Sequence, residues 1–118
     1  MKSLLIYCTH GTYGRDDDSF GALLAANAAL AKGMNTTLLL VEDGVAMIKK
    51  RQNPGKINLP NNLNEINDFI ELGGQLVAIK ESLDERGISE NEIVDGVKIM
   101  LLNEVIGIIE QHSLSLTF

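Results

Sequence analysis

Five short apolar runs are spaced along the chain, with helical patterns between most of them. Residues 4–8, 36–41, 75–79 and 97–101 are almost continuously apolar, which is typical of strands buried on both faces. Residues 114–118 alternate apolar and polar side chains and predict an edge strand with one wetter face. Because parallel strands need crossover segments, the pattern predicts a single-domain α/β fold, a five-stranded, mainly parallel sheet with helices on both faces.

The first predicted helix covers residues 20–32. Acidic residues and Ser19 at positions 16–19 suit its N-terminal cap, and Gly33 suits its end. Four alanines (Ala25, Ala26, Ala28 and Ala29) keep the rest of its surface small. Its predicted apolar face consists of Phe20, Leu23, Leu24, Leu30 and Ala31.

Further helical segments separate the later strands. A turn at residues 42–44 leads into a short helix at 45–48, and a helix beginning near Pro60 ends at Gly73. Short helical segments are expected at residues 80–86 and 89–95, the second with a capping box formed by Ser89 and Glu92. A last helix is expected from Asn103, as its cap, to about His112, which suits a C-terminal capping role. The predicted inward residues are Leu63, Ile66, Phe69 and Ile70 in the helix after Pro60, and Val105, Ile106, Ile108 and Ile109 in the last helix.

The composition argues against several kinds of partner and cellular location. The 118 residues carry a formal net charge of −6, which argues against nucleic acid or an anionic membrane as a general partner. A single cysteine cannot form an internal disulfide, which favours a reducing compartment. The apolar runs are too short for a signal peptide or a membrane span. A soluble, cytoplasmic protein is therefore expected.

The loop after the first strand holds most of the candidate chemistry, because ligands bind at the carboxyl ends of strands in open α/β sheets. Cys8 could act as a nucleophile or sulfur acceptor, or it could be a small buried hydrophobic residue. His10, two residues on, could pair with Cys8 or simply bond to the backbone. The candidate ligand-binding residues are His10, Gly11, Tyr13 and Gly14, with Lys80 at the end of the third strand.

Three polar features are open to more than one interpretation. Gly11 and Gly14 have weak phosphate-loop character, because no Gly-Lys-Ser/Thr ending follows. The three aspartates at 16–18 suit helix capping better than metal binding, so no metal and no cofactor are expected. The basic segment of Lys49, Lys50, Arg51 and Lys56 could bind an acidic partner or an anionic ligand, or could be a solvated loop.

Several segments together resemble a known family. They are THGTYG at residues 9–14, LLLVEDGV at 38–45, LVAIKESLDERGI at 76–88, GVKI at 96–99 and LSLTF at 114–118. Their order and spacing over essentially the whole chain resemble the DsrE/DsrF-like family, which includes the sulfur-relay subunits of the DsrEFH and TusBCD complexes. The resemblance implies a small α/β subunit of homo- or hetero-oligomers, often trimers or hexamers, that pass persulfide sulfur between proteins.

One position departs from the family pattern. In active members a cysteine sits just after the third strand, ahead of a Leu-x-x-Arg-Gly-like ending. Counting back from Arg86 and Gly87 places that position at Ile79. The resemblance therefore implies no persulfide carrier at the matching position.

Three interpretations follow from this departure. The chain could be a non-catalytic subunit that assembles with cysteine-bearing homologues, or a homo-oligomer with another ligand, or a sulfur carrier that uses Cys8. The first two are favoured together, because the Ala-rich and C-terminal helices carry more apolar surface than one sheet covers. Catalysis is not expected; if present, it would be sulfur transfer at Cys8. A small-ligand or nucleotide-binding module using residues 10–15 is a further alternative.

Overall fold

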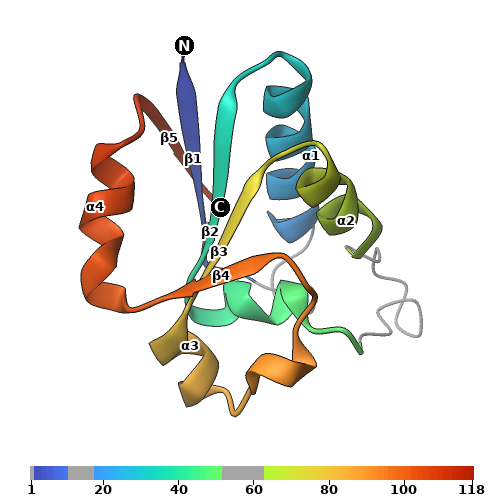
Figure 1. Cartoon of the computed structure of the whole chain (residues 1–118), viewed down its shortest axis with the longest axis vertical. Helices are drawn as coiled ribbons and strands as arrows, with labels where there is room; N and C mark the ends of the chain where they lie inside the picture. Colours follow the sequence, from blue (N-terminus) through green and yellow to red (C-terminus); the bar gives the residue numbers. More distant parts are fainter. Residues whose placement is uncertain (1, 11–17, 52–62) are drawn as a thin grey trace.

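The computed structural model describes residues 2–10, 18–51 and 63–118, with the side chains of residues 18–20 left aside. Five parallel strands form one sheet in the order β4-β3-β2-β1-β5 (Figure 1). They are β1 (Ser3–Cys8), β2 (Asn35–Leu40), β3 (Gln75–Ile79), β4 (Val97–Met100) and β5 (Leu114–Thr117). The α/β class and the parallel sheet are confirmed. The strand order itself was not predicted.

Helices cover both faces of the sheet, as predicted. One face carries α1 (Asp18–Ala31) and α2 (Leu63–Glu71), and α4 (Val105–Glu110) lies on the other side (Figure 1). The 3-10 helix η1 (Glu42–Ile48) follows β2 and α3 (Lys80–Glu85) follows β3, so both lie at the carboxyl ends of the strands. The short 3-10 turns η3 (Glu90–Glu92) and η4 (Leu102–Glu104) precede β4 and α4. No helix within the described ranges is long and apolar enough to cross a bilayer.

Small residues bring α1 onto the sheet. Ala22, Ala26 and Ala29 are buried at helical spacing together with Leu23. The prediction that Leu24 and Ala31 face inward is wrong: Leu24 is 52% exposed and Ala31 is also exposed. The alanines occupy the inward stripe, and the larger Leu24 therefore falls on the outer side.

Only one stripe of α4 reaches the core. Val105 and Ile108 are buried, one helical turn apart, against the sheet. The prediction that Ile106 and Ile109 also point inward is wrong, because they are 63% and 38% exposed. A helix of six residues can turn only a narrow face toward the sheet, which leaves the other apolar side chains outside.

Glutamates, rather than Asn103, cap the start of this region. The Leu101 amide donates to Glu104 Oε1 at 2.9 Å, and the Leu102 amide donates to Glu81 Oε1 at 3.0 Å. The prediction that Asn103 caps the last helix is therefore wrong, since a carboxylate is the stronger acceptor for these amides. The capping role of His112 is confirmed, because its Nδ1 lies 2.7 Å from the Ile108 carbonyl oxygen.

The edge strand β5 is more exposed than the central strands. β5 is an edge strand, as predicted, and its neighbour is β1. The prediction that only one face of this strand is wetter is wrong, because all four of its residues are exposed. Leu114 and Leu116 are 46% and 45% exposed. The register places them beside Leu4 and Ile6 of β1. Apolar surface therefore remains uncovered at this edge.

Candidate functional site

The sheet reverses its order of strands between β1 and β5. The chain lays down β1 to β4 in one direction and then returns to place β5 on the other side of β1. In open α/β sheets such a reversal, at the carboxyl ends of the strands, is where ligands bind. Here the Thr9 amide and hydroxyl both donate to the Phe118 carbonyl oxygen, at 2.8 and 3.0 Å. The end of β1 is thus tied to the residue that follows β5.

Among the predicted ligand-binding residues at this edge, His10 is described and partly exposed. Its Nδ1 lies 3.2 Å from the Thr9 hydroxyl. Gly11, Tyr13 and Gly14 lie outside the described residues. Their proposed roles stay predictions.

Cys8 ends β1 inside the core, with 1% of its surface exposed. Its carbonyl oxygen accepts a hydrogen bond of 3.0 Å from the Val41 amide. Gly44 packs so closely that an added Cβ would lie 2.3 Å from the same oxygen. Desolvation by burial raises the pKa of the Cys8 thiol to about 12. A neutral, inaccessible thiol favours the interpretation of Cys8 as a packed core residue.

Ile79 occupies the position where the family resemblance expects a thiol, and its side chain is fully buried. It packs in the core beneath α4, whereas Cys8 packs in the core beneath α1. The sheet register aligns Cys8 with Leu40 and Leu40 with Ala78, so Cys8 is level with the residue before Ile79. Because successive side chains of a strand alternate between faces, Cys8 and Ile79 point to opposite sides of the sheet. Cys8 therefore does not substitute in place for the missing thiol.

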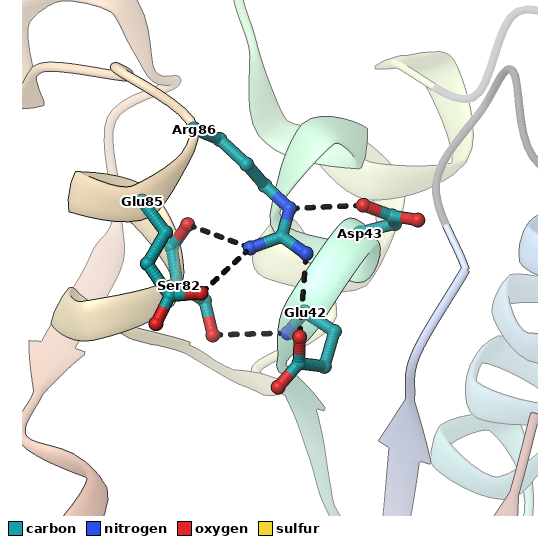
Figure 2. A network of polar contacts seen from close by, with 5 residues as sticks. All are labelled: Glu42, Asp43, Ser82, Glu85 and Arg86. Carbon is teal, nitrogen blue, oxygen red and sulfur yellow. Dashed lines mark hydrogen bonds and ion pairs between the residues drawn. The ribbon is translucent and has the colours of Figure 1, made fainter.

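A polar network joins the residues after β2 to those after β3 (Figure 2). The Arg86 guanidinium lies between two carboxylates: its Nε donates to Asp43 Oδ1 at 2.9 Å and its Nη2 to Glu42 Oε2 at 3.3 Å. Its Nη1 donates to the Ser82 carbonyl oxygen at 3.2 Å and lies 3.6 Å from Glu85 Oε2. Burial opposes the charged form of Arg86, but the Asp43 and Glu42 carboxylates outweigh it and raise the pKa of the guanidinium.

The same network fixes the start of η1. Glu42 has a φ of 50°, a left-handed conformation that is uncommon for a residue with a side chain. Its amide donates to the Ser82 hydroxyl at 2.9 Å, and Ser82 is buried. These contacts hold the turn that places Gly44 against Cys8. Sequence reasoning missed the pairing, although acidic residues after β2 and an arginine after β3 were the available signal.

Lys80 begins α3 and is exposed. Its Nζ lies 2.8 Å from Asp84 Oδ2, one helical turn on. The hydrogen bond and charge of Asp84 raise the pKa of Lys80. Across the residues that the structure describes, no group of three or more His, Cys, Asp or Glu side chains is arranged to hold a metal ion.

Sequence comparison decides the family. The sequence model of the DsrE/DsrF-like family matches residues 2–118. The chain belongs to this family. Among relatives of the DsrE/DsrF-like chain, Uncharacterized protein MJ0989 of Methanocaldococcus jannaschii is 30% identical over 118 residues, which is the whole of both chains. Uncharacterized protein MK0008 of Methanopyrus kandleri is 29% identical over 108 residues, covering 92% of this chain and 87% of the relative.

Solved structures agree with the family assignment. The crystal structure of the ychN protein from E. coli superimposes over the whole of both chains with a TM-score of 0.88 and 26% sequence identity. MTH1491 from Methanobacterium thermoautotrophicum, also matched over its full length, has a TM-score of 0.71 at 10% identity, which shows the fold alone. The DsrE-like fold of the chain is thereby confirmed.

Proposed function

We propose that this DsrE/DsrF-like chain is a non-catalytic or accessory subunit in intracellular sulfur transfer, acting through assembly with cysteine-bearing homologues. One observation carries the proposal: Ile79, fully buried, stands where the resemblance expects the sulfur-carrying cysteine. Polar contacts join α3 to η1 beside this end of β3: the Ser82 hydroxyl accepts from the Glu42 amide, and the Arg86 guanidinium donates to Asp43. A family scaffold without its thiol suits a structural role better than a catalytic one.

Exposed apolar side chains supply surface for assembly. Four of them lie close together in the chain, from the residue before η4 to the last turn of α4. They are Leu101, Leu102, Ile106 and Ile109, which are 45%, 53%, 63% and 38% exposed. A run of this kind on a soluble subunit is typical of a surface covered by another chain. The proposal places the homologue, or a further copy of this chain, on α4 and the residues just before it.

Sulfur transfer by Cys8 is the alternative, and the burial of the thiol weighs against it. A reactive sulfur acceptor needs an accessible thiol with a lowered pKa, and Cys8 has neither property. Intact-mass measurement after incubation with a persulfide donor distinguishes the two: the accessory role predicts no added sulfur on Cys8. An adduct that forms on the folded protein and is lost in Cys8→Ser would support the carrier role instead.

Light scattering after size exclusion tests assembly directly. The chain alone, and mixed with a family member that carries the cysteine, is expected to elute as a defined oligomer. Ile106→Glu should weaken that assembly, because a charge would be placed in the covered surface. Leu72→Glu is the matched control, since Leu72 is 58% exposed at the end of α2. A strict monomer that binds no cysteine-bearing homologue would overturn the proposal.

A further inference from the structure

A basic cleft lies beside η1, separate from the buried end of β1. Its volume is about 520 Å³, and its described lining residues are Lys49, Lys50, Arg51, Asn91 and Glu92. This volume lies within the range of small-molecule sites in proteins, about 300–1,000 Å³. The cleft therefore has room for a ligand larger than a single inorganic ion.

Backbone pairing fixes the two walls of the cleft. The Lys50 amide donates to the Glu92 carbonyl oxygen at 2.8 Å, and the Val94 amide donates to the Ile48 carbonyl oxygen at 2.9 Å. Lys49 and Ile93 form an antiparallel bridge between the same two segments. These hydrogen bonds therefore fix the backbone of the basic residues that follow η1.

The charge of the cleft is opposite to that of the molecule. Three of its described lining residues are lysine or arginine, although the chain carries a formal net charge of −6. Glu92 is the one carboxylate among its described lining residues, and it is engaged: its Oε1 accepts from the Ser89 amide at 3.3 Å and from the Ser89 hydroxyl at 2.8 Å. Those hydrogen bonds, with a smaller contribution from the charge of Lys49, lower the pKa of Glu92. The described lining therefore has two positive charges in excess.

Asn91 adds a neutral donor. Its side chain lines the cleft and carries an amide N–H donor, and its Oδ1 lies 2.6 Å from Ser89 Oγ, whose single proton it shares with Glu92 Oε1. Lysine ammonium, arginine guanidinium and amide N–H groups are the donors that phosphate oxygens prefer. We propose that this cleft binds a phosphorylated small molecule with at least two phosphate charges, of the nucleoside diphosphate class. Long-range repulsion by the acidic remainder of the chain disfavours a nucleic acid as the occupant.

Calorimetric titration tests the proposal with ADP, inorganic pyrophosphate and adenosine as probes. ADP and pyrophosphate should bind saturably and more weakly at high salt, whereas adenosine should not bind. The double variant Lys50→Gln/Arg51→Gln should weaken ADP binding roughly a hundredfold, at about tenfold for each lost charge-assisted hydrogen bond. Both residues are exposed, so the variant is expected to fold, which circular dichroism checks.

The control removes the same charge elsewhere. Lys2 and Lys32 are exposed at the opposite end of the sheet, before β1 and before β2. Lys2→Gln/Lys32→Gln should change ADP binding less than twofold, because only long-range charge is lost. Equal losses in both double variants, adenosine binding as tight as ADP binding, or the absence of saturable binding at millimolar ADP would each overturn the proposal. The result is independent of assembly, so failure here leaves the accessory role standing.

Discussion

Gly44→Ala probes the contact that buries the end of β1. An added Cβ would lie 2.3 Å from the Cys8 carbonyl oxygen and 3.0 Å from the Cys8 carbonyl carbon, against 3.4 Å for the start of ordinary contact. The obstacle is backbone, so relief requires β1 and η1 to separate by about 1 Å. That movement also strains the bond from the Val41 amide to the same oxygen. Overpacking and a weakened hydrogen bond together predict a loss of about 3 kcal/mol in the free energy of unfolding.

Urea unfolding followed by circular dichroism measures this loss, which also corresponds to a fall of roughly 10 °C in Tm for a chain of this size. Gly107→Ala is the control. An added Cβ there meets nothing within 4 Å, and Gly107 lies inside α4. Alanine should therefore stabilise the helix by about 0.5–1 kcal/mol. A Gly44→Ala protein as stable as wild type would refute the close packing of η1 on Cys8.

Three further predictions concern the thiol and the network after β3. In the native protein, Cys8 should react with a thiol reagent at least a thousandfold more slowly than in the urea-unfolded protein. Burial blocks access of the reagent, and the pKa raised from 9.0 to about 12 leaves little thiolate to react. Comparable rates in the two states would contradict the burial of Cys8. The unfolded chain releases the Cys8 proton above pH 9 and the folded chain does not. Stability is therefore lost as pH rises from 9 to 12, by up to about 1.4 kcal/mol per pH unit relative to Cys8→Ala, and parallel pH profiles of the two proteins would exclude this linkage. Arg86→Gln should lower the free energy of unfolding in urea by about 1–2 kcal/mol, because the Arg86 side chain is 25% exposed and bonds to Asp43 and Ser82. Lys80→Gln, which removes an exposed ion pair within one helix, should leave the unfolding midpoint unchanged. Equal effects of the two substitutions would show that the network does not stabilise the fold.

The strands were predictable because burial on both faces leaves continuous apolar runs in the sequence. β3 (Gln75–Ile79) begins and ends at the predicted residues, and β1 differs by one residue at its start. The capping box of Ser89 and Glu92 was predictable for the same local reason, since both partners lie within one turn. Such signals depend only on neighbours along the chain.

Features set by distant contacts were not predictable. The apolar sequence Val-Ile-Gly-Ile-Ile of α4 contains no polar residue to mark the outer face, so the sheet alone decides that Val105 and Ile108 are buried. Arg86 and Asp43 are 43 residues apart, and their meeting depends on β2 and β3 being neighbours. The burial of Cys8 depends on η1 folding back over β1, which the sequence marks only by Gly44.

The position of β5 has a consequence for folding. Leu4 of β1 pairs with Leu114 of β5, so completing the sheet closes a loop of about 110 residues, among the costliest closures in the chain. Contacts of such long sequence separation slow folding. Until β5 arrives, one edge of the central strand β1 exposes unpaired amide and carbonyl groups, which favours pairing with other chains. β5 therefore protects the edge of β1, and loss of β5 would promote aggregation.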